Sequence, residues 1–360
     1  MPEAIGSDRP RAVTSPCRSS CEPGYPYDRS IMMADSGISI DIWGGAEQHI
    51  GRLGNPSRPM RVLGRASATA GVHSVSYALN GRGRFPTAIG PTAFRLQAAG
   101  DFCLEFDRGR LKPGQNTVRI WVVDGEGAEE TMDVTIQATG GTRWPLPYTA
   151  DWTEVERPVD ACEFVDGRWD IREGKLRTIE PGYDRLIAIG DVAWRHYDVR
   201  VPFTVHDIDR SPVAKAWPSM GPAFGVQLRF EGHHNWGDIL PARGWFPFGI
   251  MARLEHDEDL GDTHMRLRLR GPGFVKPLAE EPEGREVQPG STYIFRVASA
   301  SAPNGQGEYA VKVWREDEAE PEEWQLTARG LDGETPAGSA LVMAHHVDAS
   351  IGTVHAAPIG

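Results

Sequence analysis

Short segments in which apolar and polar residues alternate dominate this chain. Examples are ISIDIW at 38–43 and FGVQLRF at 224–230. A period of two places the apolar side chains on one face of a β-strand. Turn signals such as the Asn-Gly pair at 80–81 separate these segments, the chain holds 41 Gly and 28 Pro, and helical patterns are scarce. The sequence therefore predicts an all-β fold with many turns.

The length and charge of the chain limit the classes of protein it can belong to. Its 360 residues exceed one ordinary core and suit two domains. The formal net charge of −12 disfavours nucleic acid as a partner, because binding to phosphates needs a basic surface. No apolar run approaches the roughly 18 residues of a membrane helix, so no membrane insertion is expected. The oligomeric state stays open.

The first 35 residues are polar and rich in Pro, Ser and Arg, which predicts a disordered leader over 1–35. This segment has no apolar core of a Sec signal, so the location is open between the cytoplasm and export by another route. A start near Met32 is also compatible with the sequence, because alternation begins only at Ile38. The four cysteines form no obvious disulfide framework.

Residues 36–138 contain six or seven expected strands, a number typical of an immunoglobulin-like sandwich. The turn and core motifs are YALNG at 77–81, GDF at 100–102 and LKPGQNTV at 111–118. In these motifs the segment resembles the bacterial immunoglobulin-like modules that are attached to sugar-active proteins. The resemblance implies a fold and no chemistry, so a passive spacer or packing domain is the expected role.

A Gly-then-Pro linker is expected over residues 139–150, and about ten further strands over 151–360. The segments DGRWDIREGKLRT (166–178), GVQLRFEGHHNWGD (225–238) and LVMAHHVDASIGTVHAAPIG (341–360) follow one another in that order. In this order the region resembles the concanavalin A-like, laminin G-like sandwiches of bacteria, which are two-sheet jelly rolls. That superfamily includes lectins, carbohydrate-binding modules, glycosidases and polysaccharide lyases. The resemblance therefore implies carbohydrate as the partner.

The loop after the strand at 223–230 is rich in imidazole, amide and indole groups. Groups that hydrogen-bond hydroxyls, beside flat rings that stack on a pyranose, are typical of a sugar-binding surface. We therefore predict a carbohydrate-binding protein whose ligand contacts this loop and the polar face of the preceding strand. The predicted ligand-binding residues are Gln227, Arg229, His233, Asn235, Trp236 and Trp245.

Alternation also assigns faces on the predicted strands. Gln227 and Arg229 are expected on one face of their strand, opposite Leu228 and Phe230. His345 shares a face with its apolar neighbours and is expected to be a hydrogen-bonded core histidine. His346, on the opposite face, is then the better functional candidate.

A carbohydrate-active enzyme that uses the same face is the alternative. Hydrolysis by the common route needs two carboxylates, and the E-x-D-x-x-E motif of jelly-roll glucanases is absent. A lyase needs Arg or Gln to neutralise a uronate and His or Tyr to move protons, but the alginate-lyase motifs Q-I-H and Y-F-K are also absent. If the chain cuts sugar, the candidate catalytic residues are His206, Glu255 and His346.

Calcium is a candidate cofactor, because loop aspartates and backbone carbonyls bind it in sandwiches of this kind. The loose candidate ligands are Asp191, Asp238 and Asp348. No sequential D-x-D-x-D-G loop supports them.

Overall fold

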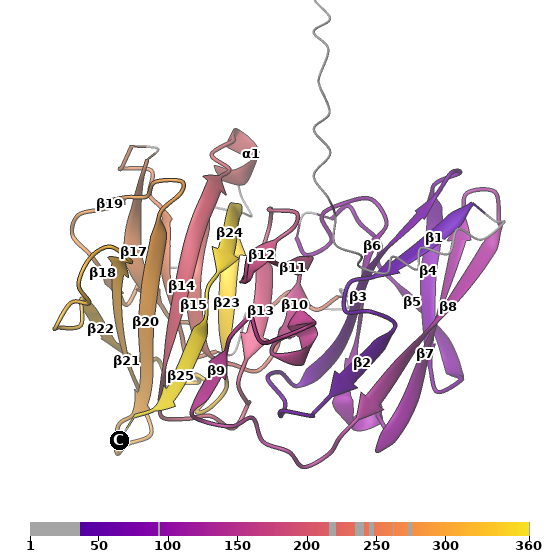
Figure 1. Cartoon of the computed structure of the whole chain (residues 1–360), viewed down its shortest axis with the longest axis horizontal. Helices are drawn as coiled ribbons and strands as arrows, with labels where there is room; N and C mark the ends of the chain where they lie inside the picture. The colour runs from indigo at the N-terminus through magenta and orange to yellow at the C-terminus, as the bar shows by residue number, and fades with distance from the viewer. Residues whose placement is uncertain are drawn as a thin grey trace, which may run out of the picture. The chain divides into compact units, whose positions relative to one another are not determined.

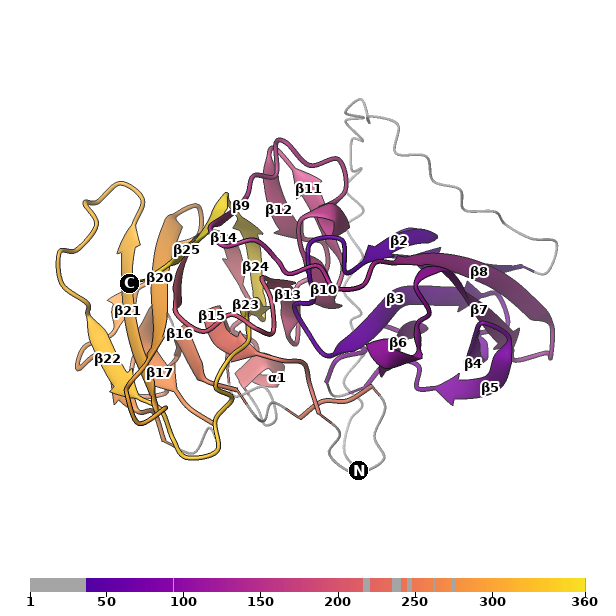
Figure 2. The same ribbon diagram turned by 90° about the horizontal axis from the view of Figure 1, so that it is seen from below.

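The computed structural model describes residues 37–92, 94–215, 221–234, 241–244, 248–261, 263–272 and 276–359. These residues belong to one compact unit, Met33–Gly360. Their regular structure is almost entirely β, so the predicted all-β sandwich fold is confirmed. The strands form two successive sandwiches (Figure 1, Figure 2), which we call the first and the second sandwich. In the described segments no helix is long and apolar enough to span a bilayer.

The first sandwich comprises residues 38–138 and has two sheets that enclose one buried core. Phe102, Leu104 and Ile120 are among the fully buried side chains of that core. The smaller sheet has the strand order β1 (Ile38–Ile42), β3 (Pro59–Ala68) and β6 (Asp101–Asp107), which the 3-10 turn η1 (Arg108–Arg110) follows. The larger sheet has the order β2 (Glu47–Ile50), β8 (Glu129–Ala138), β7 (Gly114–Asp124), β4 (Val72–Leu79) and β5 (Arg82–Thr87).

The second sandwich comprises residues 148–358. Its eight-stranded sheet has the order β10 (Glu163–Asp166), β13 (Arg185–Ile189), β23 (Ser339–His345), β15 (Ala223–Phe230), β16 (Ile250–His256), β17 (His264–Arg270) and β18 (Ala279–Glu280), with β19 (Arg285–Glu286) also on β17. Its nine-stranded sheet has the order β11 (Trp169–Arg172), β12 (Lys175–Thr178), β24 (Val347–Ile351), β14 (Tyr197–Ile208), β20 (Thr292–Ser301), β21 (Gly307–Arg315) and β22 (Leu326–Arg329), with β25 (Val354–Pro358) joining β14 to β9 (Tyr148–Ala150). The short helices are η2 (Pro158–Asp160) and α1 (Pro212–Lys215).

The core of the second sandwich lies between its two sheets, where alternate residues of the facing strands interdigitate. Phe224 on β15 meets Phe203 on β14 and Phe295 on β20, with ring centroids 5.5 and 5.7 Å apart. Leu63 and Leu96 of the first sandwich belong to the same buried cluster. The two sandwiches therefore share apolar contact as well as a polypeptide link.

Two residues other than glycine have positive φ and interrupt expected strands. His346 (φ +53°) separates β23 from β24, so the strand expected over 341–347 is divided between the two sheets. Arg229 (φ +59°) lies at a register shift between Leu228 and Phe230. The simple alternation expected there is therefore wrong after Leu228. Phe230 packs on the outer face of the sheet instead of sharing the inner face with Leu228.

Candidate functional site

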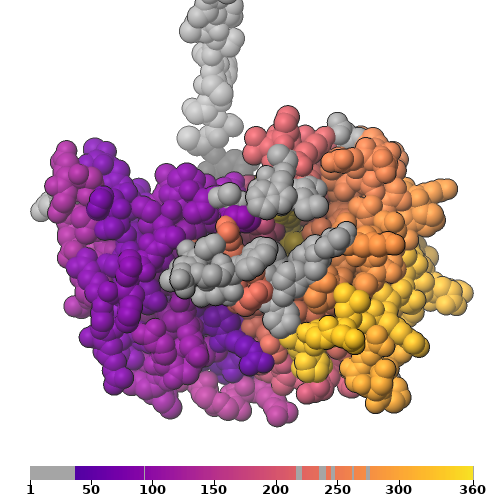
Figure 3. Space-filling model, turned by 180° about the vertical axis from the view of Figure 1, so that it is seen from behind, coloured from indigo at the N-terminus to yellow at the C-terminus, as the bar shows by residue number. Residues whose placement is uncertain are grey.

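The outer face of the eight-stranded sheet carries both apolar and polar side chains. It is the face that lies away from the other sheet, and Leu341 and Met343 of β23 belong to a small apolar cluster on it. Further along the same strands this face carries His345 of β23, with Arg253 and Glu255 of β16. Figure 3 views the molecule from this side. The surface is hollowed there, and the yellow of a C-terminal segment is visible deep in the hollow, which we call the recess.

Four aromatic and imidazole rings from three separate segments meet on this face, and we call them the ring cluster. Phe94 of the first sandwich contacts Tyr183 edge-on at 5.5 Å between ring centroids. Tyr183 contacts His345 at 4.8 Å, and His345 contacts His346 at 4.6 Å. Phe94 also lies under the guanidinium of Arg243, at 4.1 Å from its ring centroid. The cluster thus places the first sandwich and the C-terminal strands in contact on the side of the recess.

A carboxylate orients one imidazole of this cluster. Nδ1 of His345 lies 2.7 Å from Oδ1 of Asp184, and both side chains are buried. The backbone N–H of Asp184 also donates to Nδ1, at 3.2 Å, so the side chain and the main chain of Asp184 both hold this edge of the ring. The neighbouring His346 has a lowered pKa of about 4, because burial and then the charge of His345 disfavour its protonated form. His346 is therefore neutral at pH 7.

Tyr183 lies within reach of several charges. Burial and then the charge of Asp184 raise the pKa of its hydroxyl above the ordinary value. The positive charges of Arg243 and Arg253 act on the Tyr183 pKa in the opposite direction. Arg243 is linked to Tyr183 through Phe94, whose ring contacts both of them.

Glu255 is held by arginines on the same face. Its carboxylate accepts hydrogen bonds from Arg268 at 2.7 Å, from Arg270 at 2.6 Å and from Nε of Arg253. Burial opposes ionisation of Glu255, but the three guanidiniums outweigh it and lower the pKa to about 2. A carboxylate in this state does not donate a proton at neutral pH, which removes Glu255 as a general acid.

Gln227 lies on the same outer face, between Met251 and Leu341 of the neighbouring strands. The side chain is buried, and neither atom of its amide group has a hydrogen-bond partner in the described structure. A buried amide without partners costs free energy, so a group of this kind on a binding face requires an explanation.

Arg229 lies elsewhere, because the register shift turns it away from Gln227. Its guanidinium is fully buried and donates to Oγ of Ser299 at 2.9 Å and to the carbonyl of Ala300. A 3.2 Å contact with Glu334 completes the pairing. The side chain thus joins the eight-stranded sheet to β20 of the opposite sheet, and the expected exposure of Arg229 on the face of Gln227 does not occur.

The remaining catalytic candidate, His206, lies on the nine-stranded sheet. Its Nε2 is 2.7 Å from Oγ of Ser350 on β24. Burial and then the charge of Arg177 lower its pKa. His206 and Glu255 are therefore on different sheets, and the three candidates predicted as catalytic do not converge on one centre.

The predicted calcium ligands are also dispersed. Asp191 accepts backbone N–H groups of Asn55, Trp144 and Ala193. Asp348 accepts hydrogen bonds from Arg177. Carboxylates that already accept hydrogen bonds from N–H groups do not fit a cation site. The described residues contain no group of three His, Cys, Asp or Glu able to hold a metal.

Several predicted ligand residues fall in the loop after β15. His233 is buried against the ring of Phe230, and burial lowers its pKa well below the ordinary value. The remaining predictions, Asn235, Trp236, Asp238 and Trp245, lie outside the described residues.

The sequence reasoning missed the ring cluster as a group. Tyr183 and Asp184 follow a Pro-Gly turn, and Phe94 lies in a loop of the first sandwich, so no local motif links them. The one sequence signal for the cluster is the face of the strand on which His345 lies. The apolar neighbours of His345 are expected to be core residues, yet they pack on the outer face of β23.

A separate groove of about 680 Å³ lies along β20, β21 and β22 on the nine-stranded sheet. Trp324, Ala298 and Ala310 are among its lining residues. It shares no lining residue with the ring cluster.

We predict that replacing Gln227 with Met stabilises the protein. The substitution removes a buried amide without hydrogen bonds, so the free energy of unfolding should rise by about 1–3 kcal/mol. Gln48→Met is the matched control, because the buried Gln48 amide donates to the carbonyl of Gly45 at 3.2 Å. Urea unfolding should show a gain for the first variant and a loss for the second. A loss for both would mean that Gln227 has a partner.

A second prediction concerns the pH dependence contributed by Glu255. A carboxyl whose pKa is lowered on folding stabilises the protein above its ordinary pKa of 4.5, and this contribution disappears as the pH falls to about 2. Glu255→Gln should therefore be less stable than the wild type at pH 7, and the difference should narrow only below about pH 4.5. Denaturation midpoints of both proteins from pH 7 to pH 3 test this. A difference that already narrows between pH 7 and pH 5 contradicts it.

No protein-family model matches the chain, and no curated protein matches it in sequence. Among solved structures, it is similar to a xylan β-1,4-xylosidase from Bacillus halodurans C-125, with 9% identity and a TM-score of 0.36 over 84% of this chain and 63% of that one. It is also similar to a Crh5 transglycosylase in complex with NAG, with 10% identity and a TM-score of 0.31 over 61% and 89% of the two chains. A further similar structure comes from a study of carbohydrate-binding modules of the β-sandwich superfamily. It has 9% identity and a TM-score of 0.18 over 85% of this chain and 92% of that one. These neighbours include carbohydrate-active enzymes and a binding module, and their likeness is too low to carry an argument about this chain.

Proposed function

We propose that the protein binds a glycan in the recess on the outer face of the eight-stranded sheet. The observation that carries the proposal is the ring cluster, in which Phe94, Tyr183, His345 and His346 meet and the guanidinium of Arg243 lies over the ring of Phe94. Flat rings can stack on the apolar face of a pyranose, and fixed polar groups can hydrogen-bond its hydroxyls. A partly buried surface with both kinds of group suits a sugar better than an apolar ligand.

The proposed ligand surface keeps part of the set predicted from the sequence. Gln227 and His233 stay in it because they lie on, or directly after, β15, and an amide without partners can both donate to and accept from sugar hydroxyls. Asn235, Trp236 and Trp245 stay in it as predictions from the sequence, because they lie outside the described residues. Arg229 is left out because its guanidinium points between the sheets, where Ser299, Ala300 and Glu334 already bind it.

We further propose that residues 36–138 form an immunoglobulin-like domain and residues 151–360 a concanavalin A-like one. Two sheets around a shared core in each region support this division. Residues 1–35 and 139–150 would then be a leader and a linker.

Binding without hydrolysis is the form of the proposal that the carboxylates favour. The common route needs one protonated and one ionised carboxyl on either side of the scissile bond. Glu255 is ionised and held by three arginines, and Asp257 is bound by Arg266 and Arg268. Neither is free to take the role of a general acid.

A lyase is the second candidate, and the pair Asp184–His345 favours it. A histidine oriented by a carboxylate is a suitable general base, and Tyr183 lies against its ring. In this reaction the base removes the proton at C5 of a uronate, the C–H electron pair forms the C4–C5 double bond, and the C4–O bond breaks. The leaving oxygen takes a proton from Tyr183.

Removing the Tyr183 ring tests the binding site. Tyr183→Ala should weaken glycan binding by about tenfold, because stacking of one ring contributes on the order of 1 kcal/mol. Phe85→Ala is the control, since Phe85 is an exposed ring of the first sandwich far along the chain from the cluster. Isothermal titration with a glycan selected from a polysaccharide panel gives the affinities. Equal binding by both variants and the wild type would place the ligand elsewhere.

The lyase candidate is tested by absorbance of unsaturated uronates. If it is correct, uronate polymers incubated with the protein gain absorbance near 235 nm with time, above the constant absorbance of the protein itself. Asp184→Asn should then slow the reaction at least about 100-fold, because the imidazole loses the carboxylate that orients it. Binding of the polymer without any gain in absorbance leaves the protein as a binding module.

A further inference from the structure

Arg243 is a half-buried cation that no carboxylate of the described residues pairs with. It takes part in no ion pair among the described residues, and its Nε is buried without a hydrogen-bond acceptor. Its described contact is with the face of Phe94 at 4.1 Å. Burying part of a guanidinium without a carboxylate costs free energy, which an anionic ligand would offset.

Unlike Arg243, the arginines of β17 on this face form ion pairs with carboxylates. Arg266 is paired with Asp257, Arg268 with Glu255, Asp257 and Glu280, and Arg270 with Glu255. Carboxylates of the protein therefore neutralise the charges of these three arginines. Arg243 contributes a positive charge over the ring of Phe94, and it forms no ion pair with a carboxylate of the described residues.

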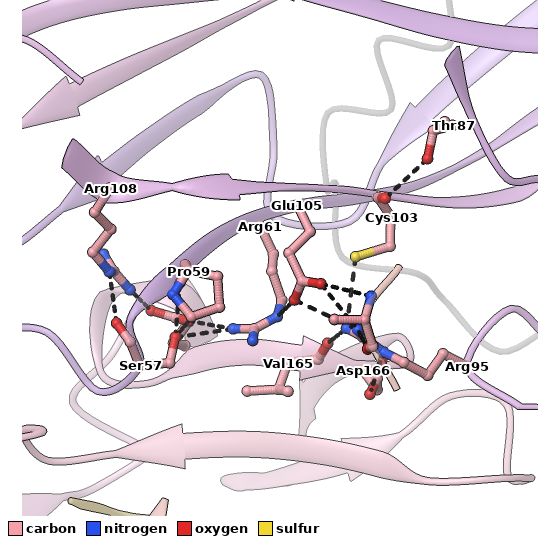
Figure 4. Close-up of polar contacts among 12 residues, drawn as sticks. Ser57, Pro59, Arg61, Thr87, Arg95, Cys103, Glu105, Arg108, Val165 and Asp166 are labelled. Atoms are coloured by element: carbon pink, nitrogen blue, oxygen red, sulfur yellow. Dashed lines mark hydrogen bonds and ion pairs between the residues drawn. The ribbon is translucent and has the colours of Figure 1, made fainter. Parts of the chain in front are cut away.

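The first sandwich holds Ala242, the residue before Arg243, through the side chains of Arg95 and Glu105, which Figure 4 shows beside Asp166. Arg95 donates to the carbonyl of Ala242, and Glu105 accepts from the N–H of Ala242 at 2.9 Å. Arg95 is itself fixed to Asp166 of the second sandwich by two hydrogen bonds of 2.7 and 2.9 Å. The backbone on the other side of Arg243 is also fixed, since Gly244 and His234 exchange hydrogen bonds of 2.9 and 3.1 Å.

We infer that the recess takes an acidic sugar, whose anionic group binds to Arg243. This inference rests on the proposed function and adds the chemical class of the ligand. The planar guanidinium presents two N–H groups side by side, which suits the two oxygens of a carboxylate or of a sulfate ester. Phe94 holds the guanidinium by its ring face, and Tyr183 supports Phe94 edge-on.

The net charge of the whole chain sets a condition on this inference. At −12 the protein repels a polyanion at long range, so attraction must come from the recess itself. Binding should then be local, confined to a few sugar units. It should weaken with added salt by less than binding to an extended basic surface does.

The test compares acidic sugars with neutral counterparts of the same backbone. The full chain is titrated with pectate, alginate and hyaluronan oligosaccharides, each beside its carboxyl-reduced form, and with dextran sulfate beside dextran. We expect at least one acidic member to bind about ten- to a hundredfold more tightly than its neutral counterpart. Preference within a carboxylate pair would identify a uronate, and preference for dextran sulfate a sulfate ester.

Variants of Arg243 assign the effect to the residue. Arg243→Gln should remove the preference for the acidic member, and Arg243→Lys, which keeps the charge but loses the two parallel N–H groups, should keep part of it. Arg110→Gln is the matched control, because Arg110 stacks on Phe85 at 5.3 Å in the first sandwich. Circular dichroism melting checks that each variant is folded.

The outcomes separate the inference from the proposed function. Equal affinity for acidic and neutral members, or a preference that survives in Arg243→Gln, overturns the inference and leaves glycan binding intact. No binding of any oligosaccharide to the wild-type protein overturns the proposed function, and the inference with it. A preference lost in Arg243→Gln and kept in Arg110→Gln supports both.

Discussion

The buried guanidinium of Arg95 is the interaction on which the arrangement of the site depends. It belongs to the first sandwich, binds Asp166 of the second, and holds the carbonyl of Ala242 in the loop beside the recess. A buried arginine is tolerated only when its charge and N–H groups are matched, and removing one partner leaves a costly unpaired charge. The first sandwich packs against the second, and in the proposed site it supplies Phe94 and holds the residue before Arg243.

Two backbone irregularities decide which side chains face the recess. The positive φ of Arg229 sends its guanidinium between the sheets and Phe230 to the outer face. The positive φ of His346 ends β23 and leaves His345 beside Tyr183 and Asp184. Local strain of this kind is common at functional sites, where surrounding contacts keep a backbone in a rarely populated conformation. Of the two residues, His346 belongs to the proposed glycan site and Arg229 lies outside it.

The sequence predicted the fold better than the site. Alternation with a period of two identified the all-β fold and most long strands, since burial of one face imposes that pattern. It failed after Leu228 and at His346, because an extra residue or a positive φ reverses all later faces and leaves no periodic signal. The site was missed for a different reason. Phe94, Tyr183 and Arg243 are far apart in the chain, and only tertiary packing brings them together.

Hydrogen–deuterium exchange with and without a bound oligosaccharide tests the central claim most directly, because it locates the ligand without a substitution. The account predicts slower exchange in peptides that contain Phe94, Tyr183, Arg243 and His345, with the groove of Trp324 on the other sheet unchanged. Slower exchange confined to β20–β22 would place the glycan in that groove. That result would contradict the assignment of the recess.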